Sequence, residues 1–391
     1  MATFSETFQS LALESLAAAS TSTSASRAAA VVRAGRARSL EDFAALISPA
    51  ASPHLEAMCA ASQELTQRHF GKVIRMFAPL YLSNECVNIC KYCGFSRNNP
   101  IPRITLPVDE VVREAAMLAR RGFRSILLVA GEHPKFVSGN YVVDCIERLL
   151  PLFPSISLEL GPLEASDYDP MVAAGCEGLV VYQETYHAPT YAELHTAGPK
   201  KHFLWRMDTA ERAYAAGFRR LGIGALLGLH DWRQDAMAVA AHAQHLLRNC
   251  WKSQITISLP RLRPAAGGFQ PRDPISDREL VQVVAAFRLF LPHAGIVLST
   301  REPARLRDGM IAVGVTHMSA GSSTEPGGYS HFDESTWTPG EQPAEQFHIA
   351  DERAPEVVAD AIRARGYEPV WKDFDRSLVA EEPRLAAAPA S

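Results

Sequence analysis

The chain has 391 residues, of which 47% are apolar, and its 39 basic and 43 acidic residues give a formal net charge of −4. This balance excludes a strongly basic surface, so we expect no nucleic-acid partner. No apolar run approaches the roughly 18 residues that a membrane-spanning helix needs, so we expect no membrane span. Seven cysteines, an odd number without a secretory segment, favour a reducing compartment, and we expect a cytoplasmic protein.

Residues 1–70 are predicted to form a peripheral helical extension. Three leucines, Leu11, Leu13 and Leu16, favour one weak helix. Ser39 has the character of an N-cap and begins a second helix, which Pro49 ends. A third helix is predicted over residues 54–70.

Residues 71–335 alternate between short apolar runs and amphipathic stretches. The runs predict strands over residues 77–82, 125–130, 156–160, 178–182, 221–225, 256–259, 295–298 and 315–319. Helices are predicted between them over residues 108–120, 142–150, 206–216, 234–248 and 277–291. Eight such units predict an α/β fold, a (β/α)8 TIM barrel with parallel strands. Residues 336–391 are predicted to be a C-terminal segment with one helix near residues 354–365 and a disordered end over residues 385–391.

Polar residues follow most of the predicted strands. They occur in the cysteine loop after the first strand and then in residues 131–133, at Glu159, and in residues 182–187, 260–264, 299–302 and 320–324. In TIM barrels the chemistry takes place at the C-terminal ends of the strands. The sequence therefore predicts a polar basin at that end of the barrel.

Three cysteines in the first of these loops, Cys86, Cys90 and Cys93, form a C-x3-C-x2-C pattern. Structural zinc sites use four closed ligands, and iron–sulfur clusters usually use four thiolates. Three thiolates leave one metal of a four-iron cluster without a protein ligand, and an open position is where a cofactor or substrate binds. A zinc site or three buried core cysteines fit this short, polar-flanked loop less well.

The cysteine spacing, with Tyr92 before the last cysteine, resembles the signature of radical S-adenosylmethionine (SAM) enzymes. Longer strings resemble the 2-iminoacetate synthase family, and the resemblance extends from about residue 40 to residue 375. These strings are residues 81–86, 182–187, 198–200, 226–233, 260–264, 298–302, 318–324 and 370–375.

This resemblance implies a radical SAM tyrosine lyase of thiamine biosynthesis. L-Tyrosine and SAM, with electrons from a reductant, would give 2-iminoacetate, p-cresol, 5′-deoxyadenosine and methionine; one electron cleaves SAM, and a second electron with a proton completes p-cresol. In that reaction a deoxyadenosyl radical takes a hydrogen atom from the tyrosine amine, and the Cα–Cβ bond then breaks. The resemblance also implies a flavodoxin- or ferredoxin-type reductant, and thiazole synthase as the protein that receives the unstable imine.

The resemblance implies the following cofactor contacts. Cys86, Cys90 and Cys93 would ligate a 4Fe–4S cluster. The SAM contacts would be Tyr92 to the adenine, Glu132 to the amino group, Glu159 to the ribose hydroxyls, and Arg206 or Arg212 to the carboxylate. A plain strand-end carboxylate at Glu159, and helix-surface roles for the two arginines, are the alternatives.

On the substrate side, Arg301 would bind the tyrosine carboxylate, with Ser299 and Ser319 nearby. The alternative for Arg301 is a salt bridge to Glu302 or Asp308. The phenol needs a proton acceptor if its O–H proton leaves during fragmentation, and the candidates are His230, Asp231 and Glu184.

There are three alternative functions. The tyrosine lyase of hydrogenase maturation carries C-terminal cysteines for a second cluster, whereas no cysteine follows Cys250 here. A tryptophan lyase of the same shape is poorly separated from a tyrosine lyase by sequence. A non-catalytic barrel with a structural metal site would have no need of a polar basin.

Overall fold

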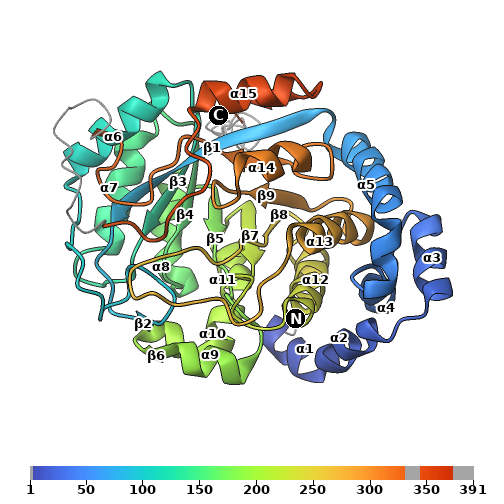
Figure 1. The fold of residues 1–391 in the computed structure, drawn as a ribbon. Helices are drawn as coiled ribbons and strands as arrows, with labels where there is room; N and C mark the ends of the chain where they lie inside the picture. Colours follow the sequence, from blue (N-terminus) through green and yellow to red (C-terminus); the bar gives the residue numbers. More distant parts are fainter. Residues whose placement is uncertain (1–2, 331–343, 373–391) are drawn as a thin grey trace, which may run out of the picture.

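Eight parallel strands close into a barrel in the computed structural model, which describes residues 3–330 and 344–372 (Figure 1). They are β1 (Val73–Ser83), β3 (Ser125–Ala130), β4 (Ser155–Glu159), β5 (Gly178–Val180), β7 (Arg220–Gly224), β8 (Gln254–Ser258), β9 (Gly295–Leu298) and β10 (His317–Ser319). The barrel closes where β10 pairs with β1, with Met318 opposite Met76. The predicted (β/α)8 barrel is therefore confirmed.

The first strand is longer than its apolar pattern predicts. It begins at Val73 rather than at residue 77, because its first residues pair with β10 and with a strand from the chain's C-terminal part, β11 (Glu368–Val370). Val73 lies opposite Glu368 in this parallel pairing. A pairing between segments so far apart in the sequence leaves no local pattern.

Helices surround the barrel (Figure 1). They are α6 (Val108–Arg120), α7 (Gly139–Leu149), α8 (Ala165–Ala173), α10 (Phe203–Met207), α11 (Thr209–Ala216), α12 (Trp232–Asn249), α13 (Asp277–Phe290) and α14 (Ala304–Met310). Helix α13 starts with a capping box between Ser276 and Glu279. The single helix predicted over residues 206–216 is two helices, which meet at Asp208. The carboxylate of Asp208 accepts a hydrogen bond from the backbone N–H of Ser5 at 2.8 Å, which ties this break to the N-terminal part of the chain.

The N-terminal part of the chain is helical, with more helices than the three that the sequence predicts. It forms α1 (Phe4–Ser10), α2 (Leu13–Thr21), α3 (Ala25–Ala34), α4 (Leu40–Leu46), a 3-10 turn η1 (Pro49–His54) and α5 (Leu55–Phe70). Helix α2 packs on α12 and α5 packs on α13, so these helices flank one side of the barrel (Figure 1). Ser39 caps α4, since its hydroxyl oxygen accepts a hydrogen bond from the N–H of Asp42 at 3.2 Å.

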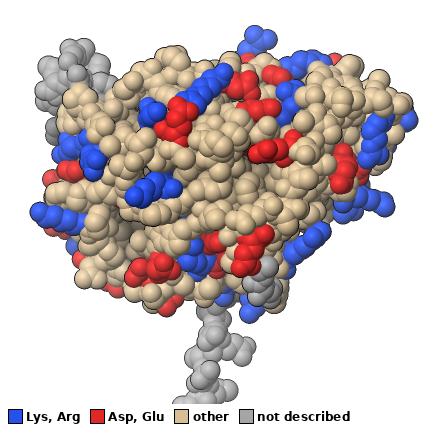
Figure 2. Space-filling model, turned by 90° about the horizontal axis from the view of Figure 1, so that it is seen from below, with Lys and Arg blue, Asp and Glu red and all other residues tan. Residues whose placement is uncertain are grey.

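The predicted C-terminal helix is α15 (Pro355–Arg363). The predicted boundary between residues 335 and 336, and the predicted disordered end over residues 385–391, lie outside the described residues. Within residues 3–330 and 344–372, none of the helices has both the length and the apolar character that crossing a membrane requires. Figure 2 shows that basic and acidic side chains are interspersed on the face nearest α9 (Ala188–Leu194) and α1, with no large field of one sign.

Candidate active site

The three cysteines lie in the loop that follows β1, at the C-terminal end of the barrel. The guanidinium of Arg103 holds this loop by donating hydrogen bonds to the carbonyl oxygens of Asn84, Phe95, Ser96 and Asn99, at 2.6–3.1 Å. A short strand, β2 (Ile89–Cys90), pairs with β6 (His195–Ala197), which places Cys90 opposite His195. Hydrogen bonds to the backbone therefore fix the loop that carries Cys86, Cys90 and Cys93.

The surroundings of these thiols suit an iron–sulfur cluster. Burial raises the pKa of the Cys90 and Cys93 thiols, and the ammonium of Lys200 is the group that most opposes that rise. Buried thiolates that repel one another need a positive counter-charge, which metal ions supply. The amide nitrogen of Asn88 lies 3.7 Å from Sγ of Cys86, as in the outer hydrogen bonds that surround ligating sulfurs.

No group of three or more His, Cys, Asp and Glu side chains among the described residues is arranged to hold a single metal ion. Zinc would bring its ligands around one centre at about 2.0–2.3 Å. In a four-iron cluster each thiolate binds a different iron, so the sulfur atoms stand farther apart. Three thiolates from one loop would leave one iron of such a cluster without a protein ligand, which is the open position expected from the sequence.

Glu132 follows β3 beside the cysteine loop. Its Oε2 accepts a hydrogen bond from Nδ2 of Asn88 at 2.7 Å, and its carbonyl oxygen accepts one from the N–H of Val87 at 2.8 Å. The preceding Gly131 approaches the loop so closely that a Cβ atom would lie 2.2 Å from the carbonyl oxygen of Glu85. This close approach requires glycine at position 131 and sets Glu132 beside the cysteine loop. Contact between the Glu132 carboxylate and the SAM amino group stays a prediction.

Tyr92 is buried in the cysteine loop. Its hydroxyl lies 2.8 Å from Nε2 of His195, and the ammonium of Lys200 lies 5.6 Å from the centre of its ring. The ring therefore has a fixed orientation beside the thiols. Its contact with the adenine of SAM stays a prediction.

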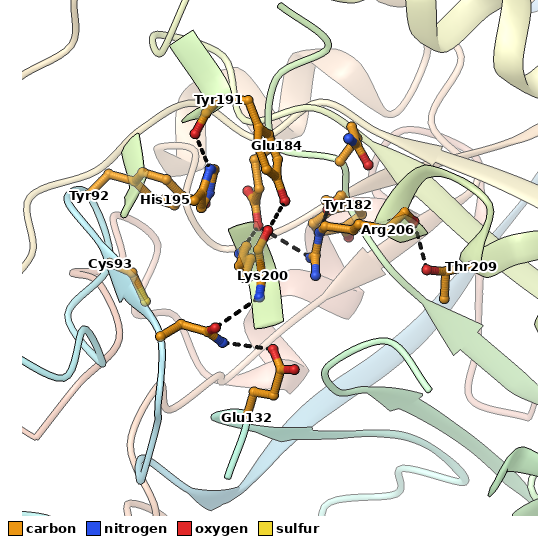
Figure 3. Close-up of polar contacts among 12 residues, drawn as sticks. Tyr92, Cys93, Glu132, Tyr182, Glu184, Tyr191, His195, Lys200, Arg206 and Thr209 are labelled. Atoms are coloured by element: carbon orange, nitrogen blue, oxygen red, sulfur yellow. Dashed lines mark hydrogen bonds and ion pairs between the residues drawn. The ribbon is translucent and has the colours of Figure 1, made fainter. Parts of the chain in front are cut away.

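A carboxylate and two cations meet next to the cysteine loop (Figure 3). Nζ of Lys200 lies 2.6 Å from Oε1 of Glu184, and a terminal nitrogen of Arg206 lies 3.7 Å from the same oxygen. Burial raises the pKa of Glu184, but the two cations outweigh this effect and lower its pKa below the ordinary value. An ionised, paired carboxylate is a weak base, so the geometry favours a positioning role for Glu184 over proton acceptance.

Glu159 ends β4 and faces the same basin. Burial raises its pKa to about 7, and the guanidinium of Arg301 is the group that most opposes this rise. A solvated strand-end carboxylate would keep its ordinary pKa, so this environment argues against the plain surface alternative. Contact between Glu159 and the ribose of SAM stays a prediction.

Arg301 follows β9, and its guanidinium carbon lies 3.3 Å from the centre of the Phe347 ring. The alternative salt bridges are not formed, because both carboxylates have other partners. Glu302 accepts hydrogen bonds from Nε of Arg261 at 3.0 Å, and Asp308 is bound by two other arginines. Arg301 is thus held by an aromatic face and is not neutralised by Glu302 or Asp308.

The two serines near Arg301 shape its loop. Oγ of Ser319 accepts a hydrogen bond from the N–H of Thr300 at 3.2 Å, and Oγ of Ser299 accepts one from the N–H of Arg301 at 3.4 Å. Ser319 is buried at the end of β10. Both hydroxyls therefore position the backbone that carries Arg301.

The two arginines proposed for the SAM carboxylate have different surroundings. Arg206 is buried beside Glu184 and donates from Nε to the carbonyl oxygen of Tyr182 at 2.9 Å. Arg212 donates from Nε to the carbonyl oxygen of Leu163 at 3.0 Å, and its guanidinium carbon lies 4.2 Å from the centre of the Trp205 ring. Of the two, the structure brings Arg206 together with the rest of the site.

His230 and Asp231 lie at the start of α12 with contacts of their own. The ring of His230 stacks on His187 at 3.9 Å, and its Nε2 lies 2.9 Å from Oε1 of Gln234. Asp231 caps α12 by accepting a hydrogen bond from the N–H of Arg233 at 2.7 Å. These contacts explain both residues structurally, and none of them joins either residue to the Glu184 group.

Lys200 and Asn88 were missed as site residues by reasoning from the sequence. Oδ1 of Asn88 accepts a hydrogen bond from the N–H of Lys200 at 2.9 Å. A Cβ atom at Gly198 would lie 2.2 Å from that same Oδ1, so this close approach requires glycine. The sequence signal for Lys200 is the string at residues 198–200, which is one of those that resemble the 2-iminoacetate synthase family. That resemblance assigns no role to the lysine.

Residues 80–241 match the Radical SAM superfamily, and residues 258–368 match the Biotin and Thiamin Synthesis associated domain. With three clustered cysteines at the C-terminal end of a (β/α)8 barrel, these matches define the class of the protein as a radical SAM enzyme.

The 2-iminoacetate synthase of Escherichia coli is 42% identical, over 88% of this chain and 90% of that protein. The 2-iminoacetate synthase of Salmonella typhimurium is 41% identical, over 87% of this chain and 88% of that protein. The chain belongs to the 2-iminoacetate synthase family. Among solved structures, the FeFe-hydrogenase maturase HydG from Carboxydothermus hydrogenoformans is similar, with a TM-score of 0.78 and 34% identity, covering 86% of this chain and 77% of that one.

Proposed function

We propose that the protein is a radical SAM tyrosine lyase. It cleaves the Cα–Cβ bond of L-tyrosine to give 2-iminoacetate and p-cresol, while SAM becomes 5′-deoxyadenosine and methionine. The 2-iminoacetate supplies the thiazole moiety of thiamine. The observation that carries this proposal is the 42% identity to a 2-iminoacetate synthase along 90% of that protein.

Cys86, Cys90 and Cys93 hold the 4Fe–4S cluster in this proposal; support comes from their position together in one loop at the C-terminal end of the barrel and from the amide of Asn88 beside Sγ of Cys86. Bound there, the cluster supplies the electron that converts SAM to the 5′-deoxyadenosyl radical. Around SAM, Tyr92 contacts the adenine and Glu132 accepts hydrogen bonds from the amino group.

Glu159 binds the ribose hydroxyls, and Arg206 pairs with the SAM carboxylate in preference to Arg212. Support for this choice comes from the buried position of Arg206 beside Glu184 and from the separate contacts of Arg212.

Arg301 binds the carboxylate of L-tyrosine. A guanidinium grips a carboxylate through two parallel hydrogen bonds, and here it has no competing bond to Glu302 or Asp308. Enclosure by the barrel keeps water from the reactive intermediates. The remaining partners are a flavodoxin- or ferredoxin-type one-electron donor and thiazole synthase, which takes the imine before water hydrolyses it.

The experiment that tests this function identifies the products formed from both parts of the substrate, the phenol side chain and the amino acid backbone. The anaerobically reconstituted enzyme is given SAM, dithionite and either L-tyrosine or L-tryptophan, and the products are separated by chromatography. With tyrosine we expect p-cresol and glyoxylate, the hydrolysis product of 2-iminoacetate, without cyanide. Turnover of L-tryptophan without turnover of L-tyrosine would overturn the proposal that L-tyrosine is the substrate. Cyanide from tyrosine would move the protein to the hydrogenase-maturation reaction, although no cysteine follows Cys250 to ligate a second cluster.

A further inference from the structure

Residues 344–351, here called the crossing segment, run over the C-terminal end of the barrel. Backbone hydrogen bonds join them to loops that follow four different strands. These bonds are Gly94 N–H to Gln346 O at 3.0 Å, Gln346 N–H to Thr324 O at 2.9 Å, His348 N–H to Pro264 O at 2.8 Å and Ala350 N–H to Thr300 O at 2.9 Å. The crossing segment therefore connects the cysteine loop with the loop that carries Arg301.

The C-terminal end of the crossing segment is firmly anchored. The carboxylate of Asp351 forms an ion pair with the guanidinium of Arg307, and both side chains are fully buried. The same guanidinium donates a hydrogen bond to the carbonyl oxygen of Ser319 at the end of β10. Removing one partner of a buried ion pair leaves an uncompensated charge, so this anchor is costly to break. The crossing segment is thus a fixed part of the barrel mouth.

Gln346 connects the barrel wall to a cysteine. Its Oε1 accepts a hydrogen bond from the hydroxyl of Tyr81 at 2.8 Å, which fixes the orientation of the amide. Its Nε2 lies 3.9 Å from Sγ of Cys93 and donates toward that sulfur. The backbone of the crossing segment also lies against the cysteine loop, because a Cβ atom at Gly94 would lie 2.6 Å from the carbonyl oxygen of Gln346.

Phe347, the next residue, contacts the other side of the site. The centre of its ring lies 3.3 Å from the guanidinium carbon of Arg301, which is close contact for a cation on an aromatic face. Its carbonyl oxygen accepts a hydrogen bond from the hydroxyl of Thr324 at 2.8 Å, so the backbone below the ring is fixed. Gln346 therefore contacts Cys93, and the adjacent Phe347 contacts Arg301, the residue proposed to bind the substrate carboxylate.

We propose that Gln346 and Phe347 are positioning residues of the active site. Gln346 donates a hydrogen bond to the thiolate of Cys93 when that thiolate ligates the cluster, and Phe347 holds the guanidinium of Arg301 ready for the substrate carboxylate. Hydrogen bonds to the sulfurs tune the reduction potential of a cluster, and a donor stabilises the added negative charge of the reduced form. Gln346 thereby makes the cluster easier to reduce. This inference deepens the proposed function and rests on it.

The test of Gln346 is a redox titration of the reconstituted enzyme without SAM or substrate, followed by electron paramagnetic resonance. Gln346→Glu keeps an acceptor for Tyr81 and removes the donor, whereas Gln346→Leu removes both. At a fixed potential the ratio of reduced to oxidised cluster should fall about threefold to tenfold in each variant, and tenfold corresponds to about 59 mV for a one-electron couple.

Gln254 lies at the opposite end of the barrel, at the start of β8. Gln254→Leu is the matched control, and the midpoint reduction potential of its cluster should be unchanged. The midpoint is read from the protein that carries the 4Fe–4S cluster, so chains without any cluster do not alter it. A midpoint that stays unchanged in both Gln346 variants would overturn the role of Gln346. Because this titration needs no substrate, its result is independent of whether the enzyme cleaves tyrosine.

The test of Phe347 compares equilibrium binding of L-tyrosine and of SAM to the reconstituted enzyme. Phe347→Leu should weaken tyrosine binding about tenfold, since a desolvated cation–π contact is lost, whereas Phe347→Trp should keep it within about twofold. SAM binding should be unchanged in both variants. Tyrosine affinity that does not change in Phe347→Leu, or that falls together with SAM affinity, would overturn the role of Phe347.

Discussion

Nζ of Lys200 lies 2.6 Å from Oε1 of Glu184, and these side chains keep 15% and 12% of their surface exposed. Glu184 has a φ of +73°, a left-handed conformation that costs on the order of 1–3 kcal/mol for a residue with a side chain. The surrounding structure has to stabilise that conformation. It does so with Lys200 and with Arg206, which approaches the same carboxylate oxygen at 3.7 Å.

Removing the carboxylate from this group should destabilise the fold more than removing one cation. In Glu184→Gln the two cations face each other without a counter-charge, and we expect a loss of ~3–5 kcal/mol in the free energy of unfolding. In Lys200→Met the carboxylate keeps Arg206, so the loss should be smaller. Urea unfolding of the two variants checks the order, and the reverse order would contradict this account of the group.

Replacing any one of Cys86, Cys90 or Cys93 by Ala should abolish 5′-deoxyadenosine formation, because each thiolate is needed to hold the cluster. Cys250→Ala is the matched control, since Cys250 is a buried thiol that follows α12 outside the cysteine loop. That variant should still form deoxyadenosine. The product is measured by chromatography after anaerobic reconstitution. A Cys90→Ala enzyme that cleaves SAM at the normal rate would refute the cluster assignment.

Arg301→Ala should weaken tyrosine binding about 10- to 100-fold, because hydrogen bonds to a charged group contribute about 1.5–3 kcal/mol. SAM binding should change little. Arg212→Ala is the control, and its tyrosine affinity should be normal, since Arg212 binds Leu163 and Trp205 apart from the Glu184 group. Both affinities can be measured by titration. Equal losses for tyrosine and SAM in Arg301→Ala would show that Arg301 has a general structural role.

Asp235 predicts a pH dependence of stability that is independent of the catalytic groups. It is fully buried on α12, and its Oδ1 accepts hydrogen bonds from Tyr186 N–H at 2.7 Å and from the Thr185 hydroxyl at 3.0 Å. Among the described residues its Oδ2 has no hydrogen-bond partner. Burial raises the pKa of Asp235 from the ordinary 3.8 to about 7.

Between these two pKa values the folded state binds more protons than the unfolded state, so stability falls as pH rises. The contribution of Asp235 is fully present below about pH 3.8 and is lost as pH rises through about 7. Asn at position 235 does not titrate. The free energy of unfolding of Asp235→Asn should therefore rise by a few kcal/mol relative to that of the unaltered protein between about pH 5 and about pH 8. A stability difference that is constant over this range would contradict the raised pKa.

Much of the fold could be predicted, because apolar runs and amphipathic stretches are local patterns. Helix α6 has the predicted bounds, and the strand predicted over residues 295–298 is β9. Features made by distant segments could not be predicted. The extension of β1 pairs with β11, and Asp208, at the break between α10 and α11, accepts a hydrogen bond from the backbone of Ser5.

In the candidate site too, features with a local sequence pattern could be predicted, and contacts between distant segments could not. The spacing of the cysteines and the positions of Glu159 and Arg301 at strand ends could be read directly from the sequence. Lys200 follows β6, which pairs with the distant β2, and Phe347 lies on the crossing segment, which returns over the barrel to Arg301, so neither contact leaves a local pattern in the sequence. The chemistry of His230 and Asp231 predicts proton acceptors; in the structure His230 stacks on His187 and Asp231 caps α12, and their part in proton transfer stays a prediction.

The most direct test of the central claim is the ratio of p-cresol to 5′-deoxyadenosine that the reconstituted enzyme forms from L-tyrosine and SAM under reducing, anaerobic conditions. The account predicts equal amounts of the two products, because each radical breaks one Cα–Cβ bond. Deoxyadenosine formed without p-cresol would contradict the tyrosine lyase function and leave only the radical chemistry in place.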